Sequence, residues 1–463
     1  MSQIRIFLTA VLVLATAVSA NARRISFSTM PNFGSGVRRP GAVAVGDFNH
    51  DGIPDLAIDN HYNDVAIFLG RGNGSFVRSA FYTLDTYVQG QIAIADFNQD
   101  GNEDLILVCG GQPEPATFAF LPGNGDGTFG AASYISADAD GSQLSIVAGD
   151  LNNDGVPDIF MGGNGASLAA INLLGGNFQP ESLQPAAGFG VGIGDFNHDG
   201  NLDVAVSGGP YQNIAVLLGN GDGSFQTPIS YPDPFEPLGI AVADFNHDNN
   251  LDLAIADYAG SLGKILLGNG DGSFHGGNTF GAGMLPATLV AADFNQDTNV
   301  DLAVSDFHKG TVAVLRGKGD GTFLLPVFYP TGTKPTMVTM GDFNLDGSMD
   351  LVAINGIDNT VTVLLNDSGT SVRLSSSNNP SQVGQPVTFT ASVSATVNQS
   401  SQPAGAVAFR DGSNLLANVA ISGGTATFTT SSLTQGTHKI RVEYSGDNFF
   451  NPNRSAILVQ TVQ

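Results

Sequence analysis

The sequence predicts an all-β protein, a seven-bladed β-propeller followed by a smaller β-sandwich, from three observations. A nonapeptide of the form D-x-N-x-D-x-x-x-D occurs seven times, opening at Asp47, Asp96, Asp150, Asp195, Asp244, Asp293 and Asp342. Successive copies start 49, 54, 45, 49, 49 and 49 residues apart, a period typical of units that must stack to bury an apolar face. After residue 366 a Ser/Thr-rich alternation replaces the repeat, as in sandwich strands.

Residues 1–22 predict a secretory signal peptide. Arg5 precedes an apolar run from Ile6 to Val18, and small residues up to Ala22 offer a cleavage site. This run is too short for a lasting transmembrane helix, and no later stretch is apolar for long enough to span a bilayer. We therefore expect an exported protein, secreted or at the cell surface, with the periplasm as an alternative and no membrane span in the mature chain.

Each repeat predicts four antiparallel strands. A strand of small and branched residues enters the nonapeptide, as at 42–46, and a second strand leaves it, as at 55–58. A third follows a variable loop, as at 65–69, and a Gly-rich hairpin such as 219–225 leads to a more polar fourth strand. Seven such units over residues 25–366 describe propeller blades of about 49 residues each.

The ends of the repeat region predict how the ring closes. The seventh repeat stops after its third strand, at 361–365, and has no Gly-rich hairpin or fourth strand. The segment 25–30, ahead of the first repeat, resembles that missing strand. We expect it to complete the last blade, because a closed ring leaves no open sheet edge.

The nonapeptide carries the donors of a calcium loop. Side-chain oxygens at positions 1, 3, 5 and 9, with the backbone carbonyl of position 7, suit a hard cation at about 2.3–2.6 Å. A metal-free turn is the alternative, since Asp, Asn and Gly are ordinary turn residues, but seven copies that keep the same acids favour calcium. The predicted ligands are Asp47, Asn49, Asp51, Ile53, Asp55; Asp96, Asn98, Asp100, Asn102, Asp104; Asp150, Asn152, Asp154, Val156, Asp158; Asp195, Asn197, Asp199, Asn201, Asp203; Asp244, Asn246, Asp248, Asn250, Asp252; Asp293, Asn295, Asp297, Asn299, Asp301; and Asp342, Asn344, Asp346, Ser348, Asp350.

Position 6 makes the seven sites unequal. Five copies have Gly there, the fifth has Asn249 and the sixth has Thr298. Because a β-branched residue is poorly suited to the left-handed region, we expect the site at Asp293 to be the weakest of up to seven Ca²⁺ sites. At the variable position 4 we expect the histidines to be solvent-facing bystanders: His50, His198 and His247.

Composition agrees with bound metal. The chain has 42 acidic and 17 basic residues and a formal charge of −25, which disfavours nucleic acid and anionic membranes as partners. The motif supplies half of the acids, and seven divalent cations would bring the charge to −11. The single cysteine, Cys109, lies in an apolar strand and is expected to be a buried, inert thiol.

The segments VAVGDFNHDGIPDLAI and LLGNGDGSF resemble the FG-GAP/VCBS repeats of the integrin α-chain propeller and its bacterial relatives, over about three-quarters of the chain. The resemblance implies the propeller and its calcium loops but no particular ligand, since that family includes adhesion receptors, lectins and other surface proteins. Asn at position 3 replaces the family's frequent Asp, and the lower ligand charge implies affinities toward about 10⁻⁴–10⁻³ M.

After a linker at 367–370, residues 371–463 predict a separate sandwich of about seven short strands. The segments GAVAFRDGSNLLANVAI and GTATFTTSSLTQGTHKIRVEYSGD resemble bacterial Ig-like repeat domains. This domain lacks the Cys and Trp landmarks of antibody domains.

Strand parity predicts where a ligand binds. Nonapeptides and Gly-rich hairpins share one face of the ring, so the second-to-third and fourth-to-first loops form the other. Variable loops on a rigid scaffold usually carry recognition. The candidate ligand-binding residues are Tyr62, Tyr211, Phe235, Tyr258 and Phe307; the alternative is that they only pack the loops.

The sequence has no nucleophile elbow and no His-rich zinc pattern, and its carboxylates are committed to turns. We therefore expect a non-catalytic, calcium-binding adhesion module, or one that binds carbohydrate or protein, with an extracellular glycan or protein as ligand. One alternative is a structural spacer in a cell-surface assembly. A less favoured one is a propeller-type polysaccharide hydrolase or lyase.

Overall fold

The computed structural model describes residues 24–60, 62–109, 117–136, 143–163, 166–184, 186–208, 213–232, 236–396 and 402–463. These ranges consist of strands, turns and loops, so the predicted all-β class is confirmed. No membrane-spanning helix is found among them. The predicted signal peptide, residues 1–22, lies outside the described ranges.

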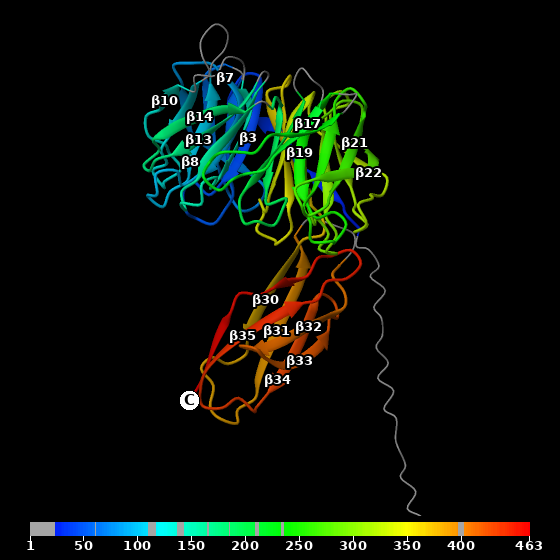
Figure 1. Cartoon of the computed structure of the whole chain (residues 1–463). Coiled ribbons are helices and arrows are strands. Elements are labelled where there is room, and N and C mark those ends of the chain that lie inside the picture. The colour runs from blue at the N-terminus through cyan, green and yellow to red at the C-terminus, as the bar shows by residue number, and fades with distance from the viewer. Residues whose placement is uncertain are drawn as a thin grey trace, which may run out of the picture.

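Within the described ranges, the strands between residues 27 and 366 form seven antiparallel sheets, which we call blades, and these make up the upper part of the molecule in Figure 1. We number the blades in chain order and give their strands from the axis outward. Blades one to three are β3 (Pro40–Gly46), β4 (Asp55–Asn60), β5 (Asp64–Gly70), β6 (Phe76–Thr83); β7 (Val88–Ala95), β8 (Asp104–Cys109), β9 (Thr117–Leu121), β10 (Ser133–Ser136); and β11 (Gln143–Gly149), β12 (Asp158–Gly163), β13 (Ser167–Asn172), β14 (Phe178–Gln184). Blades four to six are β15 (Gly190–Gly194), β16 (Asp203–Gly208), β17 (Asn213–Leu217), β18 (Ile229–Pro232); β19 (Pro237–Ala243), β20 (Asp252–Asp257), β21 (Leu262–Gly268), β22 (Phe274–Gly281); and β23 (Pro286–Ala292), β24 (Asp301–Asp306), β25 (Thr311–Leu315), β26 (Val327–Pro330).

Blade seven joins the two ends of the repeat region. Its strands are β27 (Pro335–Gly341), β28 (Asp350–Asn355), β29 (Thr360–Asn366) and, from the N-terminus, β1 (Phe27–Thr29), with β2 (Phe33–Gly34) also paired to β29. Strand β1 runs antiparallel to β29, with Phe27 opposite Asn366. The inner strands β3, β7, β11, β15, β19, β23 and β27 contact one another in an unbroken cycle. The predicted closure by the N-terminal segment is therefore confirmed.

The cores of the ring lie between neighbouring blades. The second strand of every blade is buried along its whole length, because apolar sheets cover both of its faces. Between blades one and two, for example, Ala57 and Ile67 pack with Leu105 and Leu107. Cys109 belongs to the same cluster, and burial raises the pKa of its thiol to about 12, as expected of an inert residue.

The C-terminal domain is a sandwich of two sheets below the ring in Figure 1. One sheet contains β30 (Thr370–Ser376), β31 (Val387–Ala395) and β34 (Thr425–Thr430). The other contains β33 (Asn414–Ala420), β32 (Ala406–Asp411), β35 (Gly436–Tyr444), β36 (Asn453–Arg454) and β37 (Leu458–Val462). Phe389, Phe409 and Tyr444 fill the space between the sheets.

Candidate metal loops and the opposite face

Each nonapeptide is a tight turn with two left-handed residues. At position 6, Thr298 adopts φ 77°, close to the 78–90° of the five glycines at that position. Position 4 is left-handed as well, with φ of 52–61° in all seven copies. From the glycines, the sequence predicted left-handed backbone only at position 6. Position 4 has no glycine in any copy, so its positive φ gave no signal.

The side chains at positions 1, 3 and 5 converge inside the turn. In the first copy, Asp47 Oδ1 and Oδ2 accept the N–H groups of Asp51 (3.1 Å) and Gly52 (2.9 Å). Asn49 Oδ1 also accepts the Asp51 N–H at 3.0 Å, and Asn49 Nδ2 donates to Asp51 Oδ2 at 3.0 Å. Asp51 Oδ1 accepts the N–H of Ile53, at position 7, at 2.8 Å. These side chains thus bond to the backbone of their own turn, and the predicted ligand set remains a prediction.

The Asp at position 9 is directed toward the strands. In the first copy, Asp55 Oδ2 accepts the Phe48 N–H at 3.0 Å, and Oδ1 accepts the Gly70 N–H at 2.8 Å, where the third strand ends. All seven position-9 carboxylates make this pair of bonds and are fully buried. This aspartate thus fastens the loop to its own blade, and no group of three or more His, Cys, Asp or Glu side chains meets in a metal-binding cluster within the described ranges.

The donor set nevertheless fits a hard cation. Burial, and then the nearby charges of Asp51 and Asp47, raise the pKa of Asp55 to about 6 against its two hydrogen bonds. The described residues contain no salt bridge to any nonapeptide carboxylate, so this negative charge has no basic partner. Each oxygen of Asp55 accepts one bond and keeps a second lone pair. Oxygen donors with uncompensated charge suit Ca²⁺.

In six of the seven copies position 4 bonds to the next loop, so the histidines face solvent as expected but are not bystanders. His50 Nε2 pairs with the Asn102 Oδ1 of the second loop at 2.9 Å. The same contact joins loops four and five, five and six, and, through an asparagine, three and four: His198–Asn250, His247–Asn299 and Asn153–Asn201. These side chains are exposed, but each one bridges two neighbouring turns.

The partner at position 7 decides which residue suits position 4. Where position 7 of the next loop is Val156 or Ser348, position 4 is glutamine, which donates to the carbonyl at position 6 instead. Where position 7 is Ile53, position 4 is Leu345, and a Cβ on Gly72 would lie 3.5 Å and 3.1 Å from their δ-carbons. The pairing of position 4 with position 7 of the next repeat is visible only when neighbouring repeats are aligned with each other.

A second connection uses position 2. The Phe48 ring meets Phe129 of blade two edge-on, with centroids 5.3 Å apart, and the Phe48 carbonyl accepts the Gly127 N–H at 2.8 Å. Five blades supply a glycine N–H from their hairpin, and the other two supply an asparagine amide: Asn172 and Asn366. Blade seven has no Gly-rich hairpin to supply such a phenylalanine. Instead, the Phe27 ring of β1 packs against the Phe294 ring, with centroids 5.8 Å apart.

The sandwich covers loops six and seven. Asn451 Nδ2 donates to the Phe294 carbonyl of loop six at 3.3 Å and to the Ser348 Oγ of loop seven at 3.0 Å. Thr396 Oγ1 donates to Asp346 Oδ2 at 2.6 Å, and Asp346 is only 3 % exposed. Two of the predicted metal loops therefore lie at a domain interface.

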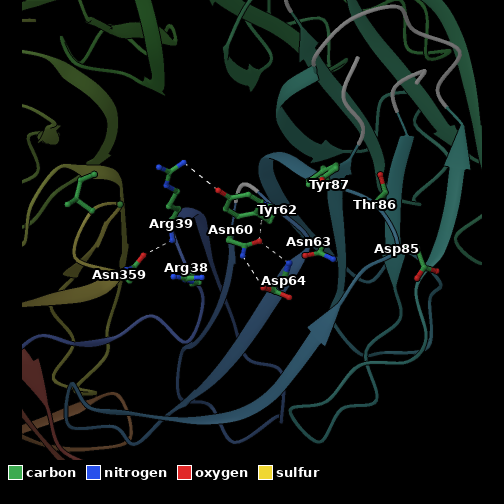
Figure 2. A pocket seen from close by; sticks show the side chains of 12 residues that line it. Arg38, Arg39, Asn60, Tyr62, Asn63, Asp64, Asp85, Thr86, Tyr87 and Asn359 are labelled. Carbon is green, nitrogen blue, oxygen red and sulfur yellow. Dashed lines mark hydrogen bonds between the residues drawn. The ribbon is translucent and has the colours of Figure 1, made fainter. Parts of the chain in front are cut away.

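The opposite face contains a cavity of about 1010 Å³ (Figure 2). Of the five predicted ligand residues, Tyr62 lines it. Tyr258 and Phe307 are half-buried and pack together at 6.3 Å outside the cavity, with Lys334 Nζ 5.0 Å from the Phe307 centroid. Two of the predicted residues fall outside the described ranges: Tyr211 and Phe235.

The fold and its loops thus define a class: a repeat-built β-propeller with acidic turns on one face and an appended sandwich. A model of the FG-GAP-like repeat matches residues 47–107, 96–161, 153–206, 195–255 and 293–353. A model of the bacterial Ig-like domain (group 3) matches residues 374–463. The chain belongs to the FG-GAP-like repeat family and ends in a bacterial Ig-like domain, as the sequence resemblance implied.

Two solved chains with TM-scores above 0.5 show the same fold at low identity, and a third match has a TM-score below 0.5. A chain of the crystal structure of BBS1N in complex with ARL6DN, soaked with mercury, matches with a TM-score of 0.54 and 11 % identity over 73 % of this chain and 96 % of that one. The lead-soaked form of that complex gives 0.53. A lectin from Agrocybe aegerita, described as recognising non-reducing terminal N-acetylglucosamine, gives 0.47 and 18 % identity over 84 % of this chain and 98 % of that one. No curated protein matches the sequence.

Proposed function

We propose that this protein is an exported, non-catalytic binding module whose propeller is stabilised by Ca²⁺ and binds an extracellular glycan or protein through the face opposite the acidic loops. The observation that carries the proposal is the division of the ring into two faces. One has seven acidic turns joined from blade to blade, and the other has variable loops around a polar cavity.

In each loop the side chains at positions 1, 3, 5 and 9 and the carbonyl at position 7 would hold the ion. Bound calcium would neutralise carboxylates that have no basic partner in the described ranges. It would also fix turns that already hold one another through positions 2 and 4. The loops are thus assigned a structural role, and ligand binding is left to the other face.

The test uses the mature chain on a glycan array and in a pull-down from extracellular extracts, each with 2 mM calcium and with EGTA. Discrete glycan or protein binding that is lost in EGTA supports the proposal. Binding to partner proteins through the sandwich alone would favour a structural spacer. Turnover of a polysaccharide would contradict the non-catalytic assignment.

A further inference from the structure

We propose that the cavity formed by Arg38, Arg39, Tyr62 and Tyr87 is a binding site for a carboxylate-bearing saccharide. The inference rests on the proposed function, because it takes the propeller for a binding module, and it names the ligand class and the site.

Four chain segments line the cavity, and one of them, with Gly356, Ile357 and Asn359, belongs to blade seven. Arg38 and Arg39 come from the loop before β3, Tyr62 from the loop between β4 and β5, and Tyr87 from the loop between blades one and two. The Tyr62 carbonyl accepts the Val88 N–H at 2.5 Å, which ties the two tyrosine loops together. A pre-formed cavity of this size can enclose a short oligosaccharide.

Arg39 is fixed in an unusual backbone conformation. Its φ is 52°, and its N–H donates to the Asn359 Oδ1 of blade seven at 2.6 Å. A left-handed arginine is strained, and such strain clusters at binding sites where the surrounding structure holds it in place. Blade seven therefore holds the Arg39 backbone at the edge of the cavity.

The two guanidinium groups retain most of their donors. Arg39 Nη1 lies 3.5 Å from Tyr62 Oη, a long contact, and no salt bridge to Arg38 or Arg39 occurs among the residues the structure describes. Two carboxylates also line the cavity: Asp64 accepts bonds from Asn60 Nδ2 (3.1 Å) and Thr83 Oγ1 (3.0 Å), and Asp85 lies beyond Thr86, on the far side from Arg39 in Figure 2. Two adjacent arginines with free forks match the planar geometry of a carboxylate.

The remaining lining favours a sugar over a peptide. Tyr62 and Tyr87 are 42 % and 61 % exposed, so their rings can stack on the apolar C–H face of a pyranose. In Figure 2, Arg39 and Asn359 lie on one side of the opening and Tyr87 on the other, with Tyr62 and Asn60 between them. Ile357 is the one aliphatic residue in this lining, which gives an apolar peptide side chain little to pack against.

The test is calorimetric titration of the mature chain, in calcium, with a galacturonate or glucuronate trisaccharide and with the neutral trisaccharide of the same linkage. We expect the acidic sugar to bind at least tenfold more tightly than the neutral one. Arg38→Gln and Arg39→Gln should each weaken acidic-sugar binding at least tenfold, and Arg39→Lys should restore it only in part. Tyr87→Ala should weaken both sugars. Arg78→Gln, at an exposed arginine on β6, is the matched control and should change neither.

Two outcomes overturn the inference: equal affinity for acidic and neutral sugars, or unchanged affinity in both arginine variants with unaltered melting. If the array finds a glycan or protein ligand whose binding ignores these variants, the cavity is not its site and the proposed function stands. If the native chain binds no glycan and no protein at all, both proposals fail.

Discussion

Loops one to five and loops six and seven share one sequence motif but have different environments. In the fourth loop Asp199 is exposed to solvent, whereas its counterpart in loop seven, Asp346, is buried under Thr396 of the Ig-like domain. Burial raises the pKa of the position-9 carboxyl to about 6 in Asp203 and to about 8 in Asp350, although both accept the same two backbone hydrogen bonds.

This difference shows that the pKa values of an acidic loop depend on which domain covers the loop as well as on the loop's own residues. The Ig-like domain removes water from loops six and seven, which strengthens repulsion between their carboxylates. The five exposed loops keep solvent as a partial screen. Covered loops should therefore depend most on a cation for charge neutralisation and release it most slowly.

Removal of calcium should have the largest effect. Each occupied loop contributes about 2 kcal/mol when calcium is some twentyfold above its Kd, so chelation should lower the melting temperature by well over 10 °C. Hydrogen exchange should then rise first in loops one to five and later in loops six and seven. Equal melting curves in calcium and EGTA would contradict the metal assignment, and simultaneous exchange in all seven loops would contradict the comparison.

The metal-free protein should lose stability as pH rises. A carboxyl whose folded pKa is raised stabilises the fold fully below its unfolded pKa of 3.8, and that contribution is lost as pH rises through the folded value. In loops one to five the position-9 carboxyl should lose this stabilising contribution by about pH 6. In loops six and seven the same carboxyl should lose it only by about pH 8. Between pH 6 and 8 the loss is about 2 kcal/mol for each of Asp301 and Asp350.

The measurement is a series of melting curves of dialysed protein from pH 5 to 8. The double variant Asp301→Asn/Asp350→Asn should flatten the segment above pH 6, whereas Asp203→Asn, in an exposed loop, should leave that segment unchanged. A flat profile in the native chain would show that the cover has no electrostatic effect.

Loss of the domain contact should expose loops six and seven selectively. Asn451→Ala removes the amide that bonds Phe294 and Ser348, and it should cost about 2 kcal/mol. Calorimetry should then show the Ig-like domain and the propeller melting further apart. Asn414→Ala, at an exposed position of the same domain, should leave the thermogram as it is. A single unshifted transition in Asn451→Ala would mean that the contact carries no coupling.

Exchange of the position-6 residues should alter stability in opposite directions. Thr298→Gly relieves a β-branched residue at φ 77° and should stabilise the metal-free protein by about 1 kcal/mol. Gly200→Thr, at φ 86° with no heavy atom within 4 Å of an added Cβ, should destabilise the metal-free protein by a similar amount. Calcium titration of the two variants also tests whether the Asp293 site is the weakest, which remains a prediction. Unchanged stability in both would show that this position is unstrained.

The position-4 bridge should show a compensating pair. His198→Leu and Asn250→Ile should each cost about 1 kcal/mol, because each removes the hydrogen bond between the two loops. The double variant copies the apolar pairing of Leu345 with Ile53 and should recover most of that loss in a double-mutant cycle. Additive losses would mean that the histidine bridge does not couple the two blades.

Much of the fold could be predicted because the same pattern of strands and loops recurs in each of the seven repeats. Seven copies of D-x-N-x-D-x-x-x-D fix the loops, the period fixes the strands, and the missing fourth strand of blade seven identifies β1 as its replacement. The role of His50 was missed because its partner, Asn102, is 52 residues away and belongs to another copy of the motif. The arginine pair that faces the cavity was missed because neither residue belongs to the repeat.

The sequence by itself determined the class, the ring, its closure and the oxygen donors of each turn, because these follow from local pattern and spacing. Only the tertiary structure decided that Asp55 and its counterparts bind the strands, that Asn451 of the Ig-like domain covers loops six and seven, and that Arg39 meets Tyr62 above a cavity. Those relations depend on contacts between distant segments. Burial and its electrostatic consequences arise only when such segments pack together.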